Sequence, residues 1–205
     1  FEGLTKTGIG VLAVNGPGAT SLADVQVLGG TLDVGAGASI IGVANATVAS
    51  GATLNVDGAF SFTPDADSFT VAGTLSGAAG FAMLAGDDVF IIQDGGDLSG
   101  LASGIDGGAG TDTLQATINA SASLAPTTNF ETLIKDGSGT LSLLGSQAYL
   151  NSRLEAGTLS VASGAMLASQ VASREEQVGP CPVPTHVRRN SDILKQPDVT
   201  AGRDP

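Results

Sequence analysis

The sequence is poor in several residue types that folded proteins commonly use. Its 205 residues include one Cys, one His, one Tyr and no Trp, and only 14 % of them are charged. A single Cys excludes an intrachain disulfide framework. The scarcity of charge disfavours an amphipathic helical bundle, whose polar faces are rich in Lys and Glu. No apolar run reaches the roughly 18–20 residues of a membrane helix, so we expect no membrane insertion of this segment.

Basic residues are especially scarce: 8 Lys and Arg stand against 20 Asp and Glu, for a net charge of −12. Because a phosphate backbone requires Lys and Arg, we expect no nucleic acid partner. The entire net charge and 28 of the 30 Gly fall in residues 1–170, whereas 171–205 hold five of the eight Pro. We therefore expect a structured segment at 1–170 and a disordered tail of unlike composition at 171–205. The chain opens at Phe1 without an initiator Met or a signal peptide, so we also expect a piece of a longer protein.

A repeat is the most prominent feature that is present. Gly-Thr-Leu or a close variant recurs, with the Leu residues 20, 22 and 21 positions apart at Leu12, Leu32, Leu54 and Leu75. Two further apolar series run in step: Val25/Val27, Ala46/Val48 and Phe69/Val71 form one, and Ile40, Phe60/Phe62 and Phe81/Met83 form the other. Such short alternating segments are typical of strands with one buried face, and the Gly, Asn and Asp between them suit tight turns.

Three short strands in each period of about 21 residues predict an all-β solenoid, a parallel β-helix in which each turn is one rung. An antiparallel β-sandwich with regular turns is the alternative. Like residues of successive rungs would stack about 4.8 Å apart, so we expect Val, Leu, Ile and Ala inside and little room for large aromatic rings. Residues 115–129 are the one stretch of 1–170 that could hold an inserted loop.

A long-range duplication accompanies the short repeat. Residues 1–12, FEGLTKTGIGVL, match residues 130–141, FETLIKDGSGTL. The two lysines of 1–170, Lys6 and Lys135, occupy equivalent places in the two copies. One building block is therefore present near each end of the repetitive segment.

These two copies resemble a known family. FEGLTKTGIGVLAVNG followed by VLGGTLDVGAGASI resembles the passenger-associated repeat of autotransporters, the type V secreted proteins of Gram-negative bacteria, as does FETLIKDGSGTLSLLG followed by LEAGTLSVASGAML. Residues 104–131 look like the segment that often precedes such a repeat. The resemblance covers about 1–170 and implies a right-handed parallel β-helix on the cell surface or in the extracellular space, outside the outer membrane. It also implies that the full-length protein has a C-terminal β-barrel translocator.

Two classes of function stay open. The first is a non-enzymatic passenger that acts as a stalk or an adhesin face, whose partners would be a host surface, extracellular matrix or other bacterial cells. Long repetitive sheets suit many weak contacts better than one deep pocket. The alternative is a secreted Ca²⁺-binding or polysaccharide-active module on the same coil.

We expect no enzymatic activity and no catalytic residues. Residues 1–170 contain no His, which excludes a Ser-His-Asp triad there. Paired carboxylates could serve glycoside hydrolysis, and candidate pairs are present at Asp65/Asp67, Asp87/Asp88 and Asp94/Asp97. An anionic polysaccharide would also need Lys or Arg nearby, and none lies between Lys6 and Lys135. Asp in these positions is more simply a turn residue.

One motif could hold a metal. Residues 107–115, GGAGTDTLQ, fit the G-G-x-G-x-D-x-U-x repeat of calcium-binding coils. A partial copy, GDDVF, lies 24 residues upstream, which is about one rung, so Asp88 and Asp112 could stack and offer carboxylate oxygens to Ca²⁺. The alternative is that these Asp-Gly turns are ordinary corners of the coil. Beyond this candidate calcium ion we expect no cofactor.

Overall fold

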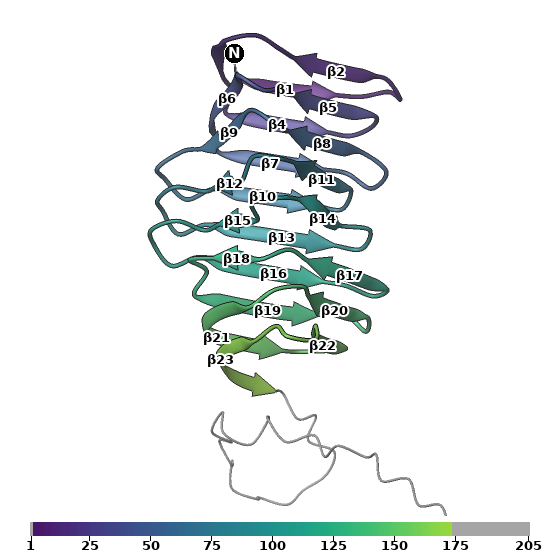
Figure 1. Ribbon diagram of the computed structural model, residues 1–205, viewed down its shortest axis with the longest axis vertical. Helices are drawn as coiled ribbons and strands as arrows, with labels where there is room; N and C mark the ends of the chain where they lie inside the picture. Colours follow the sequence, from purple (N-terminus) through teal and green to yellow (C-terminus); the bar gives the residue numbers. More distant parts are fainter. Residues whose placement is uncertain (1, 174–205) are drawn as a thin grey trace, which may run out of the picture. The chain divides into compact units, whose positions relative to one another are not determined.

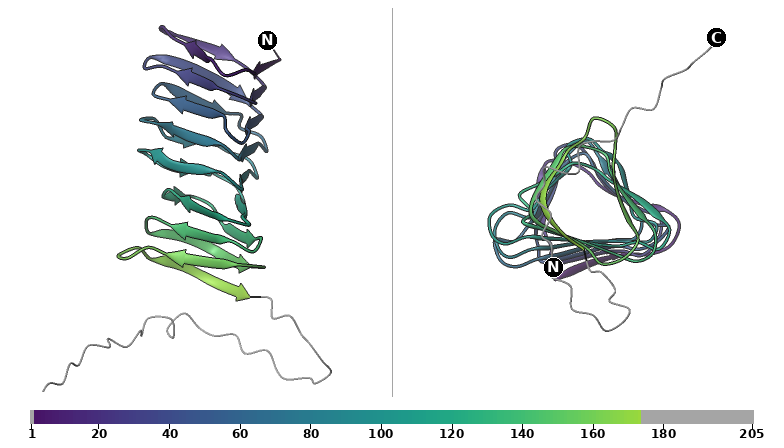
Figure 2. Two further views of the ribbon diagram at one scale, coloured as in Figure 1. Left: turned by 90° about the vertical axis from the view of Figure 1, so that its right-hand side faces the viewer. Right: turned by 90° about the horizontal axis from the view of Figure 1, so that it is seen from below.

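The computed structural model describes residues 2–173, and of residues 170–173 it describes the backbone alone. The described chain is all-β and winds through about eight turns of a parallel solenoid (Figure 1). Seen along the axis, three sheets enclose a triangular core (Figure 2). The chain visits them in the order A, B, C from β1 to β18, and from β19 to β23 it alternates between sheets A and B. Strands are hydrogen-bonded only to strands of neighbouring turns. The predicted parallel solenoid is confirmed, and the antiparallel sandwich is excluded.

Sheet A has nine strands, and sheet B has eight. The strands of sheet A are β1 (Gly3–Lys6), β4 (Asp24–Val27), β7 (Asn45–Val48), β10 (Ser68–Val71), β13 (Val89–Gln93), β16 (Thr113–Thr117), β19 (Thr132–Asp136), β21 (Gln147–Leu154) and β23 (Leu167–Ser173). Those of sheet B are β2 (Val11–Val14), β5 (Thr31–Val34), β8 (Thr53–Val56), β11 (Thr74–Gly77), β14 (Asp97–Leu101), β17 (Ser121–Leu124), β20 (Thr140–Leu143) and β22 (Thr158–Val161).

Sheet C is the shortest of the three, with six strands. They are β3 (Gly18–Ser21), β6 (Ala38–Val43), β9 (Ala59–Phe62), β12 (Phe81–Ala82), β15 (Ile105–Asp106) and β18 (Thr127–Thr128). Residues 115–129, expected as a possible insertion, span the end of β16, all of β17 and all of β18, so they form an ordinary rung.

The registers follow the three predicted series. Leu12 pairs with Leu32, Leu32 with Leu54, and Leu54 with Leu75 along sheet B. The Val25 and Val27 series stacks in the same manner along sheet A, and Ile40 lies beside Phe60 in sheet C. Rung length varies around the predicted period: Thr113 pairs with Thr132, 19 residues on, whereas Val89 pairs with Thr113, 24 residues on.

The core corrects one expectation, because large aromatic rings do fit inside the coil. Six Phe side chains are buried in the middle rungs, between sheets A and C. The ring centroids of Phe69 lie 5.3 Å from Phe90 and 5.5 Å from Phe81, which are ordinary distances for aromatic pairs. The stacking of successive rungs thus accommodates rings as a continuous column, made of Phe60, Phe62, Phe69, Phe81, Phe90 and Phe130.

The expected boundary at residue 170 falls inside β23, which ends at Ser173. Contacts divide the chain after residue 174, so the solenoid lies in the unit Phe1–Arg174. The expectation of a disordered tail lies, from residue 174 onward, outside the described residues.

The corner between sheets A and B holds a buried lysine in each copy of the duplicated block. Lys135 points inward on β19, in the ladder position that Ala116 and Leu154 fill in the neighbouring rungs. Its Nζ donates to the carbonyl oxygens of Asp136 at 2.6 Å and Gly137 at 2.7 Å. It also lies 3.3 Å from the carbonyl oxygens of Ile118 in the rung before and Ala156 in the rung after.

Lys6 repeats this arrangement at the other end of the solenoid. Its Nζ donates to the carbonyl oxygens of Thr7, Gly8 and Gly29 at 2.8, 2.9 and 2.8 Å. Gly29 belongs to the next rung, so this lysine also joins two turns. The equivalence of Lys6 and Lys135 that the sequence indicates is therefore also an equivalence of burial and bonding.

Candidate functional site

The structure brings together the two residues that the sequence singles out for a metal. Asp88 directly precedes β13 and Asp112 directly precedes β16, at the corner between sheets C and A. The N–H of Asp88 donates to Asp112 Oδ1 at 2.8 Å, so the two side chains lie one rung apart. Both are fully buried, with exposed fractions of 0 %. The predicted stacking is confirmed, whereas the binding of an ion stays a prediction.

Two further carboxylates extend the stack in both directions. The N–H of Asp67 donates to Asp88 Oδ1 at 2.7 Å, and the N–H of Asp112 donates to Glu131 Oε2 at 2.7 Å. Asp67 in turn accepts from the hydroxyl of Thr63 at 2.6 Å and from its N–H at 2.9 Å. We call Asp67, Asp88, Asp112 and Glu131 the carboxylate ladder.

The sequence reasoning missed Asp67 and Glu131 as members of the ladder, although a signal for them exists. Each lies two residues before the first buried residue of its strand, Phe69 and Leu133 respectively. Because side chains alternate with a period of two, a residue in that position points to the same side as the core. The alternation therefore extends one step beyond the strand and carries a carboxylate inward.

Close contact between rungs encloses the ladder. Gly86 and Gly110, two residues before Asp88 and Asp112, have positive φ values of 123° and 150°. A Cβ on Gly110 would lie 1.9 Å from the carbonyl oxygen of Gly86, a contact that only glycine avoids. The backbones of the two rungs therefore approach closely at this corner.

The two middle carboxylates of the ladder, Asp88 and Asp112, each use one oxygen and leave the other without a partner, whereas both oxygens of Asp67 are bonded to Thr63. Asp88 Oδ2 and Asp112 Oδ2 are buried and have no hydrogen-bond partner. Burial raises the pKa of Asp88 to about 6. The hydrogen bond from the Asp67 N–H lowers this pKa, and the negative charge of Asp112 raises it. Burial likewise raises the pKa of Asp112 and of Asp67. The ladder is a stack of carboxyl groups whose negative charge is poorly compensated.

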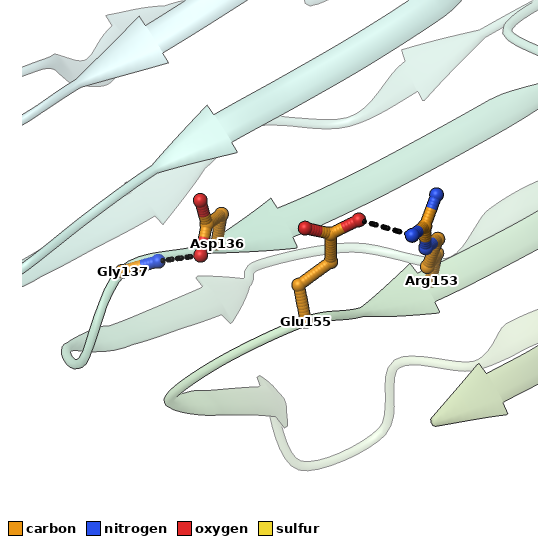
Figure 3. Close-up of polar contacts among 4 residues, drawn as sticks. All are labelled: Asp136, Gly137, Arg153 and Glu155. Carbon is orange, nitrogen blue, oxygen red and sulfur yellow. Dashed lines mark hydrogen bonds and ion pairs between the residues drawn. The ribbon is translucent and has the colours of Figure 1, made fainter. Parts of the chain in front are cut away.

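No basic side chain of residues 2–173 compensates this charge. Both lysines bind backbone carbonyls at the corner between sheets A and B. Arg153 forms an ion pair with Glu155 at 2.8 Å, near the bond from the Gly137 N–H to Asp136 Oδ1 (Figure 3). Within the same residues, no three His, Cys, Asp or Glu side chains form a group that could hold a metal. Any ion on the ladder would therefore need backbone carbonyl ligands as well as carboxylates.

The other carboxylates that were candidates for paired acids serve the turns. Asp65 and Asp87 are exposed, whereas their neighbours Asp67 and Asp88 are buried, so neither pair shares one environment. Asp94 Oδ1 accepts the backbone N–H groups of Asn119 and Ala120, at 2.6 and 3.1 Å.

Hydrogen bonds with Asn119 and Ala120 lower the pKa of Asp94. Asp97 accepts the N–H of Ser99 at 2.9 Å, and hydrogen bonds with Ser99 lower its pKa too. These carboxylates act on the backbone of their own or the next rung.

An open hollow of about 410 Å³ lies where sheet C ends, beside β18 and β21. Next to it, Thr127 hydrogen-bonds both Gln147 and Tyr149, and burial raises the pKa of Tyr149 to about 12. The hollow has uncharged walls, formed by Thr127, Thr128, Asn129, Ser146, Gln147, Ala148, Met166 and Ala168. It offers hydrogen bonds but no acid, base or ion.

In comparisons with known proteins, no family model, no curated protein and no solved structure matches the chain. Residues 2–173 include no helix of the length and apolarity that crossing a bilayer requires. What stands established is the fold, a parallel β-solenoid built from repeats.

Proposed function

We propose that residues 1–170 are part of the passenger of an autotransporter, displayed outside a Gram-negative outer membrane as a non-enzymatic stalk or adhesin face. One observation carries the proposal. The two blocks that resemble the passenger-associated repeat form equivalent corners of one solenoid, each closed over a buried lysine. The two copies of the block thus share a local structure as well as a sequence pattern.

The outer face of sheet B supports the part of the proposal in which the solenoid acts as an adhesin face. Thr53 and Asn55 of β8 point outward, as do Thr74 and Ser76 of β11 in the next rung. Asn55 donates to Asp33 at 2.8 Å and Ser76 donates to Asn55 at 3.0 Å, so the polar groups are ordered from rung to rung. A face of short polar side chains that repeats every rung suits many weak contacts with a large partner. Such a partner would be a host surface, extracellular matrix or a neighbouring bacterial cell.

The proposal is tested by display. The 205-residue chain is fused between a signal peptide and an autotransporter β-barrel in a Gram-negative host, with an epitope tag at its N-terminus. External protease should remove the tag from intact cells, and the cells should aggregate or adhere to matrix-coated plates more than cells that display the barrel alone. A tag that stays inside the cell would refute the passenger proposal.

Two variants separate the fold from the face. Leu54→Asp places a charge in the core and should abolish a folded, protease-resistant passenger. Thr53→Lys combined with Thr74→Lys alters only the outer face of sheet B and should leave the passenger folded. If the Lys variant keeps full adhesion, the adhesin face is not sheet B. If wild type displays but never adheres, the stalk role alone stands.

A further inference from the structure

The enclosed oxygens of the carboxylate ladder lack a counter-charge. Asp88 Oδ2 and Asp112 Oδ2 belong to fully buried side chains and accept no hydrogen bond. A buried carboxylate is stable only when it is paired, hydrogen-bonded or bound to a metal. The ladder gives each of these groups a single backbone N–H, on Oδ1. The second oxygen is free for a ligand from outside the chain.

The described chain cannot supply that ligand itself. Between Lys6 and Lys135 the sequence has 11 Asp and neither Lys nor Arg. The two lysines bind backbone carbonyls at the corner between sheets A and B, and the ladder lies at the corner between sheets C and A. Along the ladder, the nearest charges in sequence and in register are other carboxylates.

Spacing and chemistry favour one kind of cation. Like atoms on adjacent strands lie about 4.8 Å apart, which is about twice the 2.4 Å of a calcium–oxygen bond. Carboxylate and carbonyl oxygens are the ligands of hard cations, whereas Zn²⁺ prefers nitrogen and sulfur. Mg²⁺ keeps several of its waters when bound, whereas Ca²⁺ takes protein oxygens more readily, and the side chains of Asp88 and Asp112 are shielded from solvent.

We propose that the carboxylate ladder binds one calcium ion between Asp88 and Asp112, with backbone carbonyl oxygens of the same corner completing the ligand set. The ion bridges two rungs in the middle of the solenoid. This site does not depend on the passenger proposal, because it concerns the fold of the chain wherever the protein resides.

The test uses the full 205-residue chain, purified and freed of metal with a chelator. Equilibrium dialysis at pH 7.5 against radioactive CaCl₂ should give about one ion per chain. Thermal unfolding, followed by far-UV circular dichroism, should show a Tm at saturating CaCl₂ that is about 5 °C or more above the metal-free value. The same concentration of MgCl₂ should give a much smaller shift, which controls for ionic strength.

Matched variants locate the ion. Asp112→Asn and Asp88→Asn should each lose the bound ion and the Tm shift. Asp94→Asn, which removes an exposed carboxylate that also caps backbone N–H groups of the next rung, should keep both. If one ladder variant fails to fold by circular dichroism, the other carries the comparison.

Three results would overturn the proposal. The first is a wild-type chain that binds no calcium in dialysis. If acid alone then raises its Tm, the ladder takes up protons and not a metal ion. Calcium retained by both ladder variants would place the ion elsewhere. Calcium lost to the same extent in Asp94→Asn would indicate a diffuse effect of surface charge. None of these results depends on display, so the calcium site and the passenger proposal fail or stand separately.

Discussion

The two charged corners of the solenoid bury opposite charges and satisfy them to different degrees. At the corner between sheets A and B, Lys135 Nζ reaches carbonyl oxygens of three successive rungs at 2.6–3.3 Å. At the corner between sheets C and A, the side chain of Asp88 receives one N–H and that of Asp112 receives one. The ammonium group is fully bonded, whereas each carboxylate is bonded at only one of its oxygens.

The difference follows from the backbone itself. A carbonyl oxygen has two lone pairs, so it can accept a side-chain donor after it has accepted a ladder hydrogen bond. An N–H has a single proton and is used up by its first acceptor. A parallel solenoid can therefore satisfy an inward ammonium with carbonyls that already accept a ladder bond, whereas an inward carboxylate depends on N–H or O–H groups that the ladders leave unpaired. Thr63 supplies such groups to Asp67, but Asp88 and Asp112 each keep one oxygen without a donor.

The largest expected effect is at the lysine corner. Gly157 has φ of 74°, and a Cβ there would lie 2.3 Å from the carbonyl oxygen of Gly139 and 2.4 Å from that of Gly137. Gly157→Ala should lower the free energy of unfolding by about 3 kcal/mol, because it combines backbone strain with a clash against backbone. Gly164→Ala, with φ of 80° but no atom within 4 Å, is the control and should cost about 1 kcal/mol. Urea unfolding measures both, and equal losses would show that Gly157 does not close the corner.

A somewhat smaller loss is expected when the charge itself is removed. Lys135→Met keeps the aliphatic volume but leaves the surrounding carbonyls without their shared donor, so unfolding should become easier by about 2 kcal/mol. Lys6→Met should cost less, because Lys6 is 7 % exposed and lies in the first rung. Urea titrations of the two variants test this order. If Lys135→Met leaves the free energy of unfolding unchanged, the cost of burying the ammonium equals the stabilisation from its hydrogen bonds.

The carboxylate corner should respond to pH in the opposite direction from ordinary surface carboxylates. The pKa of Asp88 is raised to about 6 in the folded protein, so its folded form binds a proton more tightly than its unfolded form. The stability from this proton is complete below about pH 4 and is lost as the pH rises through about 6. In chelator, the Tm should therefore rise by a few degrees between pH 7.5 and pH 5. Asp88→Asn should flatten this rise, and an unchanged slope in that variant would assign the effect elsewhere.

The smallest effect concerns Asp94, an exposed carboxylate of the lysine corner. Its hydrogen bonds to Asn119 and Ala120 lower its pKa, so its contribution is present at neutral pH and is lost as the pH falls through its folded pKa, below 3.8. Asp94→Asn should therefore be less stable than wild type by a constant amount between pH 5 and pH 7.5, and this difference should shrink near pH 3. Thermal melts at these three pH values make the comparison. A difference from wild type that changes between pH 5 and pH 7.5 would contradict the assignment.

The sequence predicts the repeat and the stack of Asp88 on Asp112 because both follow from spacing along the chain. It predicts the equivalence of Lys6 and Lys135 but not their burial, since a lone lysine in an acidic segment suggests a solvated surface. The aromatic column was missed for a related reason. Whether Phe69 and Phe81 fill one interior depends on the distance between sheets, which no period encodes. The sequence favours a turn role for Asp67 because Asp is the acidic residue best suited to turns.

Where the two lysines lie along the solenoid has a mechanical consequence. Repeat proteins lose their turns from the ends, because an outer turn has one neighbour and an inner turn has two. Lys6 joins the first described turn to the second, and Lys135 joins the turns of β16, β19 and β21 near the other end. Each lysine therefore ties turns together near one end, and the turns that carry Asp67 and Asp88 lie between these two points. Fraying that begins at β23 must release Lys135 before it can reach those turns, so amide hydrogen exchange should slow sharply from β23 to β19.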